Sequence, residues 1–144
     1  MEQKKKTARL NGFTECILIL GILNSGLGIF LSIMNISQDE VSLAAGVYEI
    51  IARAAVVYFL IMLCSAKKIG LYGYLAMVVV NIIASFILCD GEYRIAFHQM
   101  TVNAFQVAIL FACLFFLKSD GVSGWDVLFD NNTINEENKA PVKK

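Results

Sequence analysis

Proline, histidine and charged residues are scarce in this chain, and their scarcity narrows what the chain can be. It has one proline and one histidine among 144 residues, and only 17% of the residues are charged. An ordinary soluble domain is about 25% charged and about 45–50% apolar, whereas 58% of this chain is hydrophobic and its mean hydropathy is +0.66. The composition indicates that lipid surrounds most of the chain. At this length it leaves no room for a separate soluble catalytic domain.

Clustered metal ligands and catalytic sets are also missing. The four cysteines, Cys16, Cys64, Cys89 and Cys113, are widely separated and form no CxxC pattern, and His98 has no neighbouring histidine or cysteine, so we expect neither a metal site nor a cofactor. No Ser/His/Asp or Cys/His arrangement is visible, so we do not expect an enzyme. Twelve basic and twelve acidic residues give a net charge of zero, which offers no support for nucleic-acid binding.

Four long apolar stretches dominate what remains. A membrane-spanning helix needs about 20 predominantly apolar residues to cross about 30 Å of hydrocarbon. Stretches of that length lie at about residues 13–36, 43–65, 69–89 and 95–117. The second stretch qualifies only if Glu49 and Arg53 are admitted to it. We therefore predict an all-α, polytopic membrane protein whose residues 13–117 form four transmembrane helices in an antiparallel up-down bundle.

The charges between these stretches predict the orientation of the chain. Basic residues precede the first stretch, separate the second from the third, and follow the fourth, whereas the other two turns are acidic; the basic positions are Lys4, Lys5, Lys6, Arg9, Lys67, Lys68 and Lys118. The positive-inside rule then places both termini in the cytoplasm. We expect a multi-pass membrane protein with a basic cytoplasmic arm at residues 1–12.

Small residues predict where the helices touch. Helices in lipid associate through close approach of small side chains and through polar contacts. The first stretch carries Gly21, Ser25, Gly28 and Ser32 on one helical face. The third carries Gly70 and Gly73 near its start. These positions are predicted to be helix-packing sites.

Polar residues recur at one depth of the predicted bundle. Asn24, Arg53, Asn81 and Gln106 lie near the middle of their stretches, and Asn103 lies close to Gln106 on the fourth. Unpartnered polar groups are costly in hydrocarbon, so these side chains should converge inside the bundle. Two readings stay open: a hydrogen-bonded layer that specifies packing, or a polar path for an ion or small solute.

Glu49 and Arg53 lie one helical turn apart in the second stretch. Helical side chains lean toward the N-terminus of their helix, so Arg53 should lean toward Glu49 and both toward the outer water. This lean reduces the cost of an arginine in the span. The pair is therefore predicted either to be a structural ion pair or to line a vestibule.

The segment after the fourth stretch differs from the spans. In residues 118–130 the apolar side chains of Trp125, Leu128 and Phe129 fall on one helical face, and Ser123 can cap that turn. This pattern predicts a short amphipathic helix anchored at the membrane interface. The polar, mixed-charge residues 131–144 are predicted to be disordered.

One motif in this segment resembles known sequences. The run DGVSGWDVL, directly after the last span, resembles the tails of uncharacterised small four-helix inner-membrane proteins of bacteria. The resemblance implies a bacterial source, so we expect a bacterial inner membrane protein. It implies no activity.

The sequence thus favours a non-enzymatic membrane protein that works by assembling with itself or with another membrane protein, as an accessory or effector. The alternative is an oligomeric channel or a small-solute transporter whose path passes Asn24, Arg53, Asn81 and Gln106. Under both of these functions, the lipid bilayer surrounds the protein.

Overall fold

A computed structural model describes residues 10–38, 42–88, 93–119 and 121–129. Residues 1–9 of the predicted basic arm and the predicted disordered tail, 131–144, lie outside these ranges. Four long helices account for most of the described chain: α1 (Gly12–Ser37), α2 (Leu43–Cys64), α3 (Lys68–Ile87) and α4 (Tyr93–Phe116). All four are long and apolar enough to cross a membrane. The predicted fold class, an all-α membrane bundle, is confirmed.

Local side-chain chemistry fixes where the first two helices begin. The side chain of Asn11 accepts a hydrogen bond from the Phe13 amide at 2.9 Å, and Ser42 accepts one from the Ala45 amide at 3.3 Å. Such N-caps satisfy amides that have no partner within the helix. Between α2 and α3 the chain reverses through Ala66, which adopts a positive φ of 53°.

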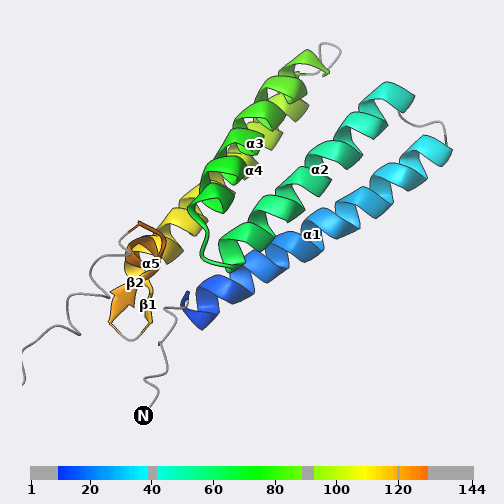
Figure 1. Cartoon of the computed structure of the whole chain (residues 1–144). Coiled ribbons are helices and arrows are strands. Elements are labelled where there is room, and N and C mark those ends of the chain that lie inside the picture. The colour runs from blue at the N-terminus through cyan, green and yellow to red at the C-terminus, as the bar shows by residue number, and fades with distance from the viewer. Residues whose placement is uncertain (1–9, 39–41, 89–92, 120, 130–144) are drawn as a thin grey trace, which may run out of the picture.

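The helices follow one another around the bundle (Figure 1). α1 lies beside α2 along its length, α2 packs on α3, and α3 packs on α4, whereas α4 returns to α1 at few points. We call the end that carries the start of α1 and the α2–α3 turn the cap end. The opposite end, where α1 and α3 finish and α2 and α4 begin, is the open end.

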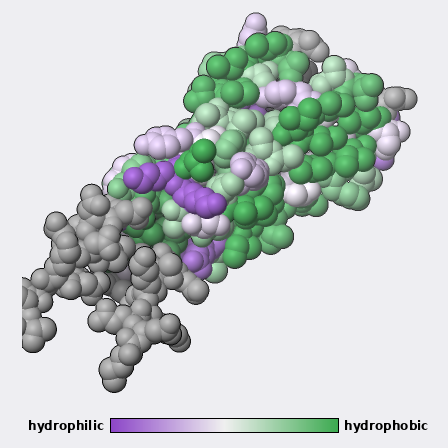
Figure 2. Space-filling view, viewed as in Figure 1, coloured by the Kyte–Doolittle hydropathy of each residue, from purple (hydrophilic) through white to green (hydrophobic). Residues whose placement is uncertain are grey.

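Large apolar side chains cover the outside of the bundle (Figure 2), where green hydrophobic atoms spread over the helical part of the visible face. Leu23, Phe105 and Phe116 are 63%, 68% and 82% exposed. A soluble protein rarely exposes continuous apolar surface of this extent. The arrangement therefore suits contact with lipid.

The apolar core is concentrated toward the cap end. Leu18, Leu63, Leu71 and Leu114 are almost completely buried there, and they belong to α1, α2, α3 and α4 respectively. Leu10, just before α1, joins the same cluster. One leucine from each helix thus holds the four helices together at this end.

A small cap completes the core after α4. Strands β1 (Lys118–Ser119) and β2 (Val122–Ser123) form an antiparallel hairpin, and Gly121 between them has a φ of +85°, which glycine adopts without strain. Helix α5 (Gly124–Phe129) follows. The Asn11 side chain donates a hydrogen bond to the Lys118 carbonyl at 2.7 Å, so the cap lies against the start of α1. Both ends of the described chain therefore meet at the cap end.

The cap agrees with the predicted segment 118–130 in part. The short helix is present, and the capping role of Ser123 is confirmed, because its Oγ accepts from the Asp126 amide at 3.2 Å and donates to the Asp126 carboxylate at 2.7 Å. The hairpin was not predicted, since two-residue strands leave no periodic pattern. Leu128 is only 1% exposed and packs in the protein core. Trp125 stacks on Phe115 and Phe129 with ring centroids 4.6 and 4.3 Å apart. The membrane-interface location of this segment stays a prediction.

Gly70 provides a test of the helix packing, because α3 approaches the backbone of α2 at this residue. A methyl group there would overlap the Leu63 amide nitrogen and the Phe59 carbonyl. We expect Gly70→Ala to destabilise the protein by about 1–3 kcal/mol, the usual cost of overpacking, and to lower its melting temperature in mild detergent. Gly26→Ala is the control, since nothing lies within 4 Å of a methyl group at that position. Equal melting temperatures for the two variants would contradict the close approach.

Candidate functional site

A polar cavity of about 950 Å³ occupies the half of the bundle nearer the open end. All four long helices contribute to its wall. Its polar and charged lining residues are Asn24, Ser25, Tyr48, Glu49, Arg53, Tyr74, Asn81, Ser85, Gln99, Asn103 and Gln106. Asn24, Arg53, Asn81 and Gln106, which the sequence predicts to converge, all line this space.

One face of α2 forms the charged side of this cavity. The lining residues Tyr48, Glu49, Ala52, Arg53 and Val56 recur at intervals of three and four along the chain, which is the spacing of one helical face. Glu49 and Arg53 are the charged residues among those that line the cavity.

The Glu49–Arg53 ion pair lies in the wall of this space. The Arg53 Nε and Nη2 atoms donate to the same Glu49 oxygen, Oε1, at 3.0 and 2.6 Å, so the predicted lean of Arg53 toward Glu49 is confirmed. Within the described chain, Arg53 Nη1 and Glu49 Oε2 have no hydrogen bond. The two side chains are 33% and 43% exposed. The pair is therefore accessible from the cavity and is not sealed in the core.

Gly28 makes the position of Arg53 possible. A methyl group at Gly28 would overlap the Arg53 guanidinium, so the guanidinium lies directly against the backbone of α1. One turn later, the buried Ser32 hydroxyl donates to the Gly28 carbonyl at 2.9 Å. This close approach ties the charged face of α2 to α1.

A second polar contact joins α2 to α3. The Tyr48 hydroxyl donates to Asn81 Oδ1 at 3.1 Å. The Ser85 hydroxyl donates to the Asn81 carbonyl at 2.8 Å. The Tyr48 hydroxyl thus positions the Asn81 side chain, which lines the cavity.

The remaining cavity amides are not paired with one another. Asn24, Gln99 and Gln106 are exposed and Asn103 is half-buried, and no hydrogen bond of these four side chains is found in the ranges that the structure describes. A hydrogen-bonded layer would require such bonds. Of the two readings of the polar residues, the geometry favours the cavity.

The predicted packing residues lie at helix contacts. Ser25, Gly28 and Ser32 are buried on α1, and Gly21 is half-buried. On α3, Gly70 is buried against α2, and a methyl group at Gly73 would overlap the Phe59 ring. Asn24 and its neighbour Ser25 both line the cavity, but Asn24 is exposed whereas Ser25 is buried.

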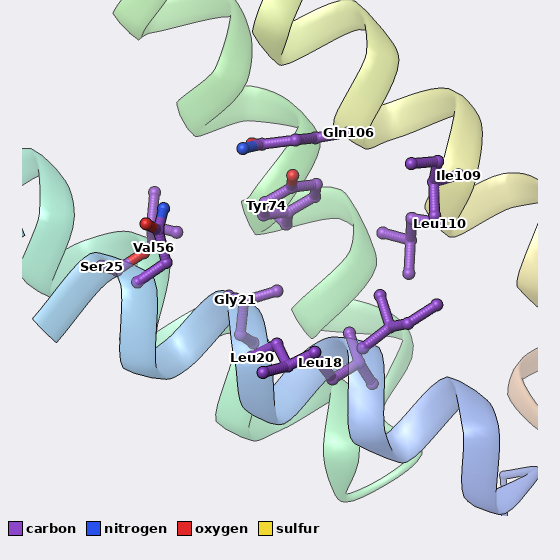
Figure 3. Close-up of a pocket in the computed structure, with 12 residues that line it drawn as sticks. Leu18, Leu20, Gly21, Ser25, Val56, Tyr74, Gln106, Ile109 and Leu110 are labelled. Atoms are coloured by element: carbon purple, nitrogen blue, oxygen red, sulfur yellow. The ribbon is translucent and has the colours of Figure 1, made fainter. Parts of the chain in front are cut away.

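An apolar pocket of about 240 Å³ adjoins the polar cavity on the side of the cap end (Figure 3). Five residues line both spaces: Asn24, Ser25, Val56, Tyr74 and Gln106. In this view the Tyr74 hydroxyl of α3 points toward the Gln106 side chain of α4, away from Gly21 and Leu18 on α1. The lining therefore changes from polar in the cavity to apolar in the pocket, going from the open end toward the cap end.

Tyr48 and Tyr74 are functional-site residues that the sequence reasoning missed. Both are aromatic residues within apolar stretches, where they read as part of the lipid-facing surface. A signal for Tyr48 was present, since it shares a helical face with Ala52 and Val56. Tyr74 likewise lies on the α3 face of Val78, Asn81 and Ser85.

The site offers hydrogen-bonding groups and one neutral ion pair. In the described ranges, no three His, Cys, Asp or Glu side chains gather in a group that could hold a metal ion. The chemistry available in the cavity is recognition of polar groups by amides, hydroxyls, a guanidinium and a carboxylate.

Comparisons with protein-family models, curated proteins and solved structures find no match for this chain, so no relative lends it an activity.

The ion pair makes a prediction about stability. We expect Glu49→Leu to lower the melting temperature in mild detergent more than the double variant Glu49→Leu/Arg53→Leu, because the single change leaves the guanidinium without its partner. Phe105→Leu, on the lipid-facing surface, serves as the control. Equal melting temperatures for the single and double variants would mean that Arg53 does not depend on Glu49.

Proposed function

We propose that this chain is a non-enzymatic, multi-pass membrane protein that binds a small polar solute in the polar cavity, as a small-solute transporter or membrane receptor. The observation that carries the proposal is the gathering of polar side chains from four helices around one space of about 950 Å³. Ligand sites in proteins commonly measure about 300–1,000 Å³. The cavity is large enough for a small molecule.

The unpaired amides support the same proposal. An amide that is removed from water without a hydrogen-bond partner costs several kcal/mol in hydrocarbon. Asn24, Gln99 and Gln106 are exposed, so water, a polar solute or a packed partner must satisfy them. A cavity that holds water in the membrane is a favourable place for a solute that can replace that water.

The leucine core at the cap end argues against a permanently open pore. Leu18, Leu63, Leu71 and Leu114 fill the bundle there, and each is at most 2% exposed. A solute that enters from the open end meets this core and the apolar pocket. A binding site with access from one side fits this shape better than a continuous channel.

The basic residues give the direction of access. With Lys67 and Lys68 in the cytoplasm, under the positive-inside rule, the cap end faces the cytoplasm and the open end faces outward. We place the protein in a bacterial inner membrane with both termini inside. The cavity then opens to the outer side.

Cysteine labelling tests the cavity and its direction. In a variant without the four native cysteines, a cysteine at Asn103 or Ser37 should react with a membrane-impermeant thiol reagent added to intact cells or right-side-out vesicles. A cysteine at Lys67 should react only after permeabilisation, and one at the lipid-facing Phe105 should stay unreactive. An unreactive cysteine at Asn103, with Ser37 labelled, would overturn the water-filled cavity. Labelling of Lys67 from outside would overturn the orientation.

Assembly is a second candidate function, and the α1–α4 side of the bundle favours it. These two helices touch at few points, so the ring of helices is least complete there. The polar residues Asn24 and Gln106 lie on α1 and α4 beside this side. A second copy or another membrane protein that packs here would shield them from lipid.

The oligomeric state in mild detergent tests this candidate. We expect a homo-oligomer, measured by light scattering after size-exclusion chromatography. Cysteines introduced at Leu20 and Ile109, which flank the α1–α4 side, should form intermolecular crosslinks, whereas one at Ile61 of α2, which is 50% exposed, should not. A monomer at all protein concentrations without crosslinks would exclude self-association through this side.

A further inference from the structure

We propose that the ligand of the cavity is a zwitterion with an apolar tail, the chemistry of a long-chain α-amino acid. The charged head would bind at Glu49 and Arg53, and the tail would enter the apolar pocket. This inference rests on the proposed function, since it names the class of solute that the cavity takes.

The ion pair selects the head group. The two groups are bonded to each other at 2.6 Å through Nη2 and Oε1, yet the Arg53 and Glu49 side chains stay 33% and 43% exposed, and Glu49 Oε2 has no hydrogen bond within the described chain. A ligand carboxylate can bind the guanidinium while a ligand ammonium group binds the carboxylate. A head with one charge would satisfy one member of the pair and face repulsion from the other. A zwitterion complements both.

The adjoining pocket selects the tail. Leu18, Leu60, Ile109 and Leu110 line the apolar pocket, and Gly21 leaves space on α1 (Figure 3). Because Val56, Tyr74 and Gln106 line both spaces, a single molecule can extend from one into the other. Burial of an apolar tail here is favourable, at a roughly constant gain for each methylene group.

The helix geometry sets the length of the tail. The Arg53 guanidinium lies against Gly28, and the apolar pocket reaches Gly21 on the same helix. Seven residues at a rise of 1.5 Å each separate these levels by about 10 Å. A short side chain would not reach the pocket, whereas an extended chain of several methylene groups would.

A series of four compounds tests the proposal on the full-length protein in lipid nanodiscs. We use α-aminooctanoic acid, its short-tailed analogue α-aminobutyric acid, octanoate and octylamine, and we measure binding by isothermal titration calorimetry against empty nanodiscs. We expect saturable binding of α-aminooctanoic acid, at least tenfold tighter than that of each other compound.

Two variants separate the head site from the tail site. Glu49→Gln removes the carboxylate and leaves the guanidinium, so we expect octanoate to bind this variant at least as tightly as α-aminooctanoic acid does. Ile109→Trp fills the apolar pocket and should remove the advantage of the long tail. Phe105→Leu, on the lipid-facing surface, should bind like the unmodified protein.

The outcomes are distinct. Equal binding of α-aminooctanoic acid, octanoate and octylamine to the unmodified protein would overturn the zwitterion site, because it would reflect partition by the tail alone. No binding of any compound, with the Asn103 cysteine labelled from outside, would overturn the ligand class and leave the proposed function standing. No binding together with an unreactive Asn103 cysteine would overturn both.

Discussion

A guanidinium inside a membrane span must be paired and hydrated, and the open half of this bundle is arranged around that requirement. An arginine near the centre of a span costs about 2.5–3.5 kcal/mol on the insertion scale. Here Glu49, one turn away, accepts two of its hydrogen bonds, and Gly28 lets the guanidinium reach the backbone of α1. The pair stays one-third or more exposed to the cavity. The glutamate, the glycine and the cavity are therefore parts of one arrangement.

The two halves of the bundle are held by different forces. At the cap end, leucines from all four helices interlock, and the hairpin and α5 cover them, with Lys68 donating to the Phe129 carbonyl at 3.3 Å. Toward the open end, the contacts include the close α1–α2 approaches at Gly28 and Gly46, the Phe86–Phe97 ring contact and the Tyr48–Asn81 hydrogen bond. Interhelical hydrogen bonds in membranes average only about 0.6 kcal/mol. The apolar core therefore lies mainly at the cap end, whereas polar side chains gather toward the open end.

Sequence reasoning reached the features that one helix determines by itself. Apolar length predicted the spans, spacing predicted the buried Ser25, Gly28 and Ser32, and the i, i+4 relation predicted the Glu49–Arg53 pair. What it missed depends on how helices sit relative to one another. Residue spacing within one helix does not predict that α4 makes few contacts with α1. Because these two helices are separated, the amides line a cavity and do not form a bonded layer. The burial of Leu128 also depends on tertiary packing, here against α4 and the start of α1.

The incomplete α1–α4 side links the two candidate functions. A solute that enters the cavity cannot continue through the leucine core, so its exits are the open end and this side. The same side is where a second copy would cover Asn24 and Gln106. Packing there would change access to the cavity, and a bound solute would change the surface that the second copy meets. Binding and assembly would then be thermodynamically coupled, and each would alter the equilibrium of the other by the same factor.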